Sequence, residues 1–182
     1  MRPTLADLES AKERLLPDVI APGLRVLFCG INPGLWSAAT GHHFARPGNR
    51  FWPALDDAGF TPRRLEPADQ ARLLDLGLGL TNMAPRATAR AEELDIEEIR
   101  AGGRALVEKV ETFGPRWVAV LGVTAYRSAF GHRQAQVGEQ HERVGGAQVW
   151  VLPNPSGLNA HWTPGQLAAE FSRLRDASLR PA

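Results

Sequence analysis

The chain has 182 residues, of which 43% are hydrophobic and 23% are charged, and its formal net charge at pH 7 is +1. These values are typical of one globular domain with a sizeable core, and they mean that any nucleic-acid partner would have to bind a local basic patch. The single cysteine, Cys29, excludes an intrachain disulfide and a cysteine-ligated iron–sulfur cluster. No apolar run approaches the roughly 20 residues that span a bilayer, and the N-terminus has no signal-peptide core, so we expect a cytoplasmic protein with no membrane partner.

The first half of the chain is predicted to contain helices on either side of one strongly buried strand. Leucines at helical spacing after Thr4, a suitable N-cap, predict a helix over residues 4–16, within an N-terminal helical extension over residues 1–20. Residues 24–29 are apolar except for Arg25 and predict a strand buried on both faces. Residues 37–49 have no strong periodicity and are expected to form a functional or disordered loop. Helices are predicted over residues 50–59 and 67–76, the first capped by Asn49, and a short strand over residues 78–83.

The second half continues the alternation of helices and strands. A helix is predicted over residues 93–113, although the Gly102-Gly103 pair weakens its middle. The remaining predicted elements are a strand over residues 117–121, a helix over residues 123–130, a strand over residues 149–152 and a closing helix that begins with Thr163 and Pro164. The alternation predicts an α/β fold, a three-layer α/β/α sandwich around a short, mainly parallel β-sheet, in one domain covering residues 1–182.

Two of the predicted strands end in loops that contain an Asn-Pro pair. Asn32 lies in the sequence Gly-Ile-Asn-Pro-Gly after the first strand, and Asn154 lies in Pro-Asn-Pro-Ser-Gly-Leu after the last. Each pair alone is equally typical of an ordinary turn. Because parallel strands end at one edge of a sheet, where ligands bind in open α/β folds, the two asparagines are predicted to face one cleft.

Three segments together resemble the mismatch-specific uracil-DNA glycosylases, which include bacterial G·U mismatch enzymes and eukaryotic thymine-DNA glycosylases. The segments are GINPG at residues 30–34, GHHFARPGNRFW at residues 41–52 and NPSGL at residues 154–158. The resemblance implies a DNA repair enzyme that flips out uracil, and also thymine or other damaged pyrimidines, mispaired with guanine. It would hydrolyse the N-glycosidic bond and leave an abasic site. The resemblance also implies a monofunctional glycosylase without metal or cofactor, acting on double-stranded DNA with a G·U or G·T mismatch. We expect a monomer by default, since the sequence does not determine the oligomeric state.

The resemblance also assigns roles to individual residues. Asn32 would position the attacking water, and its amide is too weak a base for fast chemistry. Phe44 would stack on the flipped base, the alternative being that it only packs its loop. The residues implied to bind the base are Ile31, Gly34, Ser37, Phe44 and Asn154. The implied DNA wedge is Gly157, Leu158 and Asn159, and the implied phosphate contacts are Arg46, Arg50, Arg86 and Ser156.

Two features depart from the family pattern. Ala160 follows the wedge where bacterial relatives have an arginine, which weakens the expected anchoring on the mismatch. Glu93 and Asp95 belong to an acidic group at the start of the helix predicted over residues 93–113. These carboxylates either complement the helix dipole or supplement Asn32 as further catalytic residues, and the sequence leaves both interpretations open.

Other interpretations remain beside the glycosylase. Any single arginine is more often only solvated or paired than bound to phosphate. A non-catalytic α/β protein that binds a nucleotide or abasic DNA would need the same fold, but loss of Asn32 would be its simplest origin, and Asn32 is present. A Rossmann-type nucleotide-binding domain is disfavoured, because no strand is followed by a G-x-G-x-x-G or P-loop motif.

Overall fold

The computed structural model describes residues 2–181. The strands are β1 (Val26–Gly30), β2 (Leu78–Asn82), β3 (Trp117–Leu121), β4 (Gly138–Val144) and β5 (Ala147–Leu152). The α-helices are α1 (Leu5–Ser10), α2 (Leu35–Thr40), α3 (Phe51–Asp57), α4 (Ile96–Phe113), α5 (Val123–Phe130) and α6 (Pro164–Leu179). Short 3₁₀ helices are η1 (Ala11–Glu13), η2 (Pro67–Leu76) and η3 (Ala91–Glu93).

The five strands form one sheet in the order β2-β1-β3-β5-β4. β1, β2, β3 and β5 pair in parallel, and β4 pairs antiparallel with β5 at one edge. The predicted mainly parallel sheet is confirmed. The loops that follow β1, β2, β3 and β5 therefore gather at the carboxyl edge of the sheet, which is where α/β folds place their ligands.

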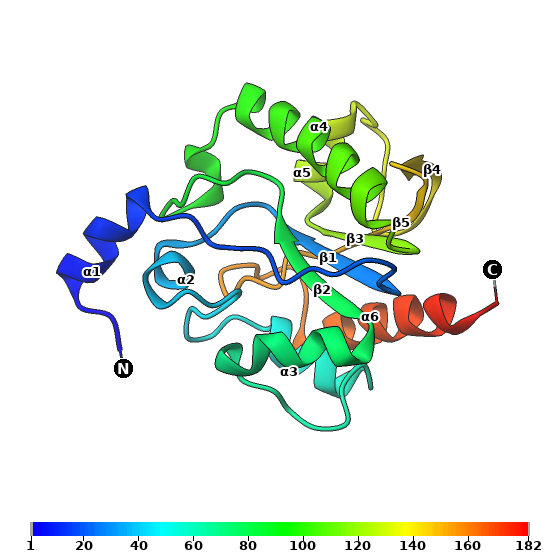
Figure 1. Cartoon of the computed structure of the whole chain (residues 1–182), viewed down its shortest axis with the longest axis horizontal. Coiled ribbons are helices and arrows are strands. Elements are labelled where there is room, and N and C mark those ends of the chain that lie inside the picture. The colour runs from blue at the N-terminus through cyan, green and yellow to red at the C-terminus, as the bar shows by residue number, and fades with distance from the viewer. Residues whose placement is uncertain (1, 182) are drawn as a thin grey trace.

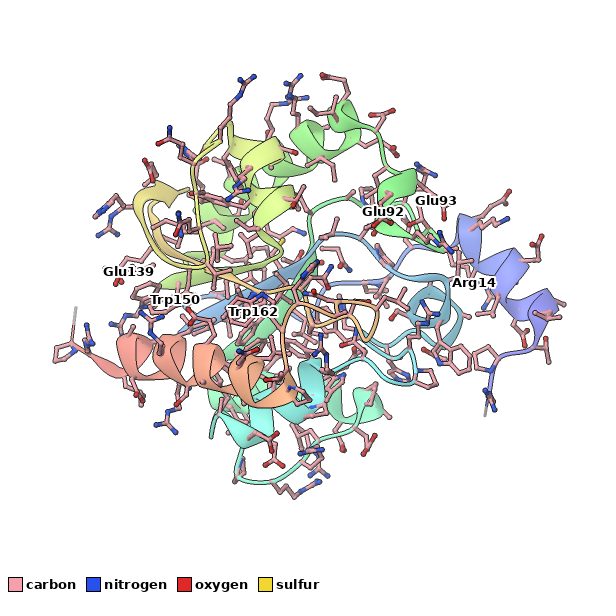
Figure 2. The ribbon with its side chains drawn as sticks, turned by 180° about the vertical axis from the view of Figure 1, so that it is seen from behind. Arg14, Glu92, Glu93, Glu139, Trp150 and Trp162 are labelled. Atoms are coloured by element: carbon pink, nitrogen blue, oxygen red, sulfur yellow. The ribbon has the colours of Figure 1, made fainter. Side chains whose placement is uncertain are left out.

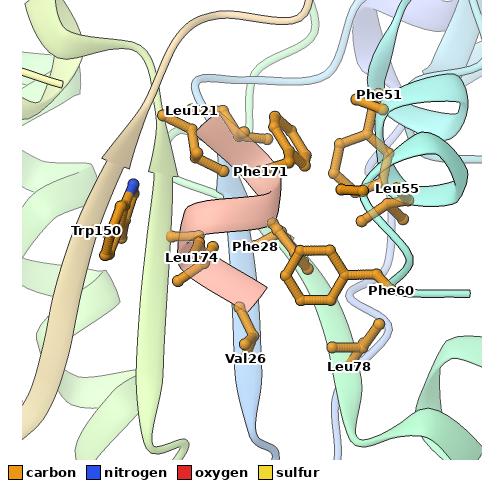
Figure 3. Packing of buried hydrophobic residues seen from close by; sticks show 14 of the residues in the cluster. Val26, Phe28, Phe51, Leu55, Phe60, Leu78, Leu121, Trp150, Phe171 and Leu174 are labelled. Carbon is orange, nitrogen blue, oxygen red and sulfur yellow. The ribbon is translucent and has the colours of Figure 1, made fainter. Parts of the chain in front are cut away.

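Helices cover both faces of this sheet (Figure 1). Side chains alternate between the faces along each strand, so Val26 and Phe28 pack with α3 and α6 whereas Leu27 and Cys29 pack with α4 and α5. Figure 3 shows the first cluster, in which Phe28 meets the ring of Phe51 edge-on at 5.4 Å between centroids. The predicted three-layer α/β/α architecture is thus confirmed.

The structure differs from the predicted elements in three places. Helix α2 forms inside the stretch predicted as a loop and ends at Gly41, whose left-handed backbone (φ 73°) stops it. Strand β4 was not predicted, because its exposed Glu and His side chains interrupt any apolar run. The N-terminal helix is shorter than predicted, since α1 gives way to η1 and none of its own residues is buried.

No helix within residues 2–181 has the combination of length and hydropathy that a membrane crossing requires.

The Gly102-Gly103 pair in the middle of α4 allows two close backbone contacts. A Cβ atom at Gly102 would lie 2.4 Å from the carbonyl oxygen of Met83, and one at Gly103 would lie 3.1 Å from Ala129 in α5. The weakened helix interior is therefore the cost of packing α4 closely on the segment after β2 and on α5.

We expect Gly102→Ala to lower the free energy of unfolding by about 1–3 kcal/mol, although alanine is the better helix former by about 1 kcal/mol. The added methyl group would meet backbone atoms of Met83, which cannot rotate away. Urea denaturation measures the change. The control is Gly165→Ala in the first turn of α6, where a Cβ meets nothing within 4 Å, and this variant should be at least as stable as the parent. A Gly102→Ala protein as stable as the parent would contradict the argument.

Candidate functional site

A cavity of about 730 Å³ opens at the carboxyl edge of the sheet, between the loops that follow β1, β2 and β5. We call it the Asn32 pocket. The pocket is lined by all the residues predicted to hold the water or the base, which are Asn32, Ile31, Gly34, Ser37, Phe44 and Asn154. The two Asn-Pro loops therefore do share one cleft, as the parallel sheet predicts.

The side-chain amide of Asn32 is held in one orientation by two acceptors. Its Nδ2 donates to the carbonyl oxygen of Arg86 at 2.8 Å and to Oγ1 of Thr88 at 2.7 Å. Thr88 Oγ1 in turn donates to the carbonyl oxygen of Arg90 at 2.8 Å, so towards Asn32 this hydroxyl can only accept. Both amide hydrogens are used, and Oδ1 has no hydrogen-bond donor among residues 2–181. The geometry leaves a carbonyl-type acceptor available in the pocket.

Thr88 is a site residue that sequence reasoning missed. It lies in a loop without regular structure, far from the Asn-Pro motifs in sequence, and lines the pocket from a buried position. Its backbone also pairs with the Asn32 loop, because Thr88 N donates to Pro33 O and Leu35 N donates to Thr88 O. A threonine in a polar loop carries no sequence signal that distinguishes it from any surface threonine.

Phe44 forms one wall of the pocket on a strained backbone. Among the described residues it is the non-glycine residue with a positive φ (53°), a conformation that costs energy and persists only when neighbours enforce it. Its ring stacks on Phe51 at 4.1 Å between centroids, and a Cβ atom at Gly30 would lie 3.4 Å from the ring. The same Cβ would lie 2.6 Å from Oδ1 of Asn82, which also lines the pocket. Gly30 therefore lets the pocket floor come close to strand β1.

The loop that carries Phe44 is fastened by its neighbours. Ser37 Oγ accepts from Ala45 N at 3.1 Å, and Trp52 Nε1 donates to the carbonyl oxygen of His43 at 3.0 Å. His43 itself is buried, and burial lowers the pKa of its imidazole, so the ring is neutral at pH 7. It serves as a hydrogen-bonded part of the pocket wall, with its Nε2 at 2.9 Å from Pro17 O.

The loop after β5 is organised by its own polar side chains. Asn154 Oδ1 accepts from Ser156 N at 2.9 Å, and Asn159 Nδ2 donates to Asn154 O at 3.0 Å. A Cβ atom at Gly157 would lie 2.6 Å from Gly48 O, so this loop packs directly on the loop before α3. Leu158 at its tip is 70% exposed, a large apolar side chain presented to solvent at the mouth of the pocket.

Arg50 does not have the free guanidinium that a phosphate contact requires, so its geometry does not support the predicted role. The guanidinium donates to the carbonyl oxygens of Ser156 at 3.0 Å, Asn159 at 2.9 Å and Trp162. Its backbone N also donates to Pro155 O. Arg50 thus ties the start of α3 to the loop over residues 154–162, and Trp162 at the end of that loop is labelled in Figure 2.

The other residues predicted to bind phosphate differ in whether their side chains already have partners within the protein. Arg86 binds the carboxylate of Glu98 through two hydrogen bonds of 2.6 and 2.8 Å, and its Nη2 also donates to the carbonyl oxygen of Glu93. This pairing raises the pKa of Arg86 and lowers the pKa of Glu98 to about 2. Arg46 is exposed and lines the pocket, and Ser156 lines it with a hydroxyl that accepts from Leu158 N at 3.3 Å.

The structure does not bring Glu93 or Asp95 into the pocket. Glu93 Oε1 accepts from Arg90 N, and Asp95 Oδ1 caps α4 by accepting from Glu98 N, both at 2.8 Å. Helix capping is therefore the role that their geometry supports. The carboxylate that does line the pocket is the neighbouring, exposed Glu92, which Figure 2 labels beside Glu93. Of the two interpretations that the sequence leaves open, a role at the helix terminus is therefore the one that this geometry supports, and the turn η3 places Glu92 at the cleft.

Comparisons with known proteins bear on the family and on the fold. The sequence-family model described as the uracil DNA glycosylase superfamily matches residues 17–177 of this chain. The solution structure of a candidate uracil DNA glycosylase from Methanosarcina acetivorans superposes with a TM-score of 0.60 at 19% identity, covering 90% of this chain and 98% of that one. At this identity the structural likeness is evidence for the fold.

We expect Arg50→Met to loosen the loop over residues 154–162, because three carbonyl oxygens lose their donor. The free energy of unfolding should fall by about 1–3 kcal/mol, and amide hydrogen exchange in this loop should accelerate at least roughly tenfold. The control is Arg46→Met, which removes an exposed guanidinium without a hydrogen bond to any described residue. Equal exchange in the two variants would rule out the tying role.

Proposed function

Because the chain belongs to the uracil DNA glycosylase superfamily, whose members are DNA glycosylases, we propose that it removes uracil mispaired with guanine from double-stranded DNA. The target nucleotide is flipped into the Asn32 pocket, the N-glycosidic bond is hydrolysed without a lyase step, and an abasic site remains. Thymine opposite guanine is the slower substrate, because thymine is the less activated leaving group.

The fixed amide of Asn32 is the observation that carries this proposal. With both amide hydrogens bonded, Oδ1 accepts a hydrogen bond from a water and holds it against the sugar carbon. An amide oxygen cannot remove a proton before the bond breaks, so the leaving base departs first and the water attacks an oxocarbenium-like sugar. This order suits a base whose anion is stable, and uracil is such a base.

The walls of the pocket suit a pyrimidine. Phe44 supplies a ring face for stacking, which is worth about 1–3 kcal/mol per base. Asn82 lines the pocket with a carboxamide that has no side-chain hydrogen bond among residues 2–181, and it can pair with both a carbonyl and an imide N–H on the base edge. Hydrogen bonds to the base carbonyls stabilise the negative charge that develops as the base leaves.

The exposed Leu158 supports insertion of this loop into the duplex. An apolar side chain between base pairs offsets part of the unstacking cost of a few kcal/mol. Backbone groups of residues 157–159 then face the guanine left without a partner, which gives the preference for a G·U mismatch. The connection to Arg50 keeps this loop in place while Leu158 is inserted.

The proposal is tested by single-turnover cleavage of duplexes with G·U, G·T or A·U and of single-stranded DNA with uracil. We expect G·U to react fastest, and Asn32→Ala to lower its rate roughly 100-fold or more, because the water loses its position. Uracil release that persists unchanged in Asn32→Ala would contradict the assigned role. Tight binding of the G·U duplex with no uracil release by the parent protein would establish a non-catalytic DNA-binding protein instead.

The variant Thr88→Val tests whether the orientation of the Asn32 amide matters, because the amide itself is retained. Valine has nearly the same shape but cannot accept from Asn32 Nδ2, so the amide can rotate and Oδ1 is no longer fixed. We expect the single-turnover rate on G·U to fall roughly tenfold with the dissociation constant for DNA unchanged.

The matched control is Thr88→Ser, which keeps the hydroxyl and should retain the parent rate. A serine variant as slow as the valine variant would show that the methyl group or the packing of Thr88 is what matters.

A further inference from the structure

Two more hollows continue from the Asn32 pocket towards the helices α4 and α5. The first, of about 630 Å³, shares Ile31, Glu92 and Asn154 with the pocket, and the second, of about 510 Å³, lies between α4 and α5. Thr124, in the first turn of α5, borders the pocket and both hollows. The two hollows therefore adjoin the Asn32 pocket through shared lining residues.

Four arginines border the second hollow, which we call the arginine hollow. Arg100 and Arg104 lie one turn apart on α4, Arg127 lies on α5, and Arg133 lies just after it. No aspartate or glutamate is among the residues that line this hollow. Such a concentration of one charge stands out in a chain whose formal net charge is only +1.

Most of this positive charge is not neutralised by the protein. Arg100 pairs with Glu97 at 2.7 Å, and Arg127 Nε donates to the carbonyl oxygen of Ala135 at 2.8 Å, which is uncharged. The exposed guanidiniums of Arg104 and Arg133 have no hydrogen bond or ion pair with another residue in the range 2–181. The hydroxyls of Thr124 and Ser128 add neutral donors on the α5 side.

The close packing of α4 on α5 brings these arginines around one hollow. Gly103 lies in the middle of α4, between Arg100 and Arg104, and a side chain there would meet Ala129 of α5 at 3.1 Å. Figure 1 shows the two helices beside one another on the same face of the sheet. Gly103 thus lets α4 lie close to α5 and shortens the distance between the arginines of α4 and those on the α5 side of the hollow.

We propose that the arginine hollow binds phosphate groups of the DNA backbone that flanks the target nucleotide. Guanidinium groups suit phosphate oxygens, and cations on two neighbouring helices suit a chain of phosphates better than a single anion. Because the hollow adjoins the Asn32 pocket through Thr124, DNA is the occupant that fits it, since the strand that delivers the flipped base would lie beside that pocket. This inference rests on the proposed glycosylase function and adds a second region of DNA contact to it.

The test is the salt dependence of DNA binding by Arg104→Gln/Arg133→Gln, measured by fluorescence anisotropy with a labelled G·U duplex and a fully paired G·C duplex. Because each lost phosphate contact reduces the slope of log affinity against log salt by about 0.9, we expect the slope to fall by about 1.8 on both duplexes. The dissociation constant at low salt should rise roughly tenfold. The single-turnover rate at saturating protein should stay unchanged, because neither arginine lines the Asn32 pocket.

The control is Arg63→Gln/Arg180→Gln, which removes the same charge next to α3 and α6, the helices on the other face of the sheet. Arg63 follows α3 in a turn, and the carbonyl oxygen of Arg180 accepts from Arg116 just before β3. A salt slope that does not change in the hollow variant, or that changes equally in the control, would overturn the proposal and point to a protein partner or to bulk charge.

If the proposed function were wrong, the parent protein would release no uracil in the cleavage assay. The salt dependence of binding would still show whether the arginine hollow binds DNA.

Discussion

The backbone pairing between β1 and β2 continues past the ends of both strands, and the site depends on this continuation. Met83 N donates to Gly30 O and Ala84 N to Ile31 O, after which the chain returns so that Thr88 N donates to Pro33 O. The Asn-Pro loop is therefore held by a neighbouring segment and not only by its own turn. This pairing brings the Thr88 hydroxyl and the Arg86 carbonyl to the amide of Asn32, and it is the reason why a flexible side chain has one orientation in the free protein.

The second constraint is that other parts of the chain must come close to the backbone of particular residues. Glycine allows such contacts at three positions. Gly30 admits the Phe44 ring and Asn82 to the pocket floor, Gly102 admits the backbone of Met83, and Gly157 admits the backbone of Gly48. The three contacts join the loops after β1, β2 and β5 to each other or to the core. A site assembled from loops reaches the rigidity of regular structure in this way, because loop atoms contact backbone that cannot move aside.

The sequence predicts the sheet and the pocket well because both follow from short-range patterns. Buried strands that end in Asn-Pro loops are recognisable locally, and parallel pairing then brings Asn32 and Asn154 to one edge. The contacts that complete the site are long-range and polar, as between Arg50 and the carbonyl oxygens more than 100 residues away. No periodicity encodes such contacts. The same limit applies to the acidic group, in which the local turn η3 turns Glu92 to the pocket and leaves Glu93 as a cap.

The arginines illustrate how one residue type serves two purposes in a chain of nearly balanced charge. Arg50 donates to carbonyl oxygens and Arg86 is paired with a carboxylate, so both guanidiniums organise loops, and the charge of Arg86 is balanced by its partner. Arg104 and Arg133 are exposed and border a hollow that adjoins the pocket through Thr124. Because phosphate binding depends on cations that are not already paired, the position of unpaired arginines matters more for DNA affinity than the net charge. Under the proposed function, the DNA affinity of a protein of net charge +1 would therefore depend on where its unpaired arginines lie.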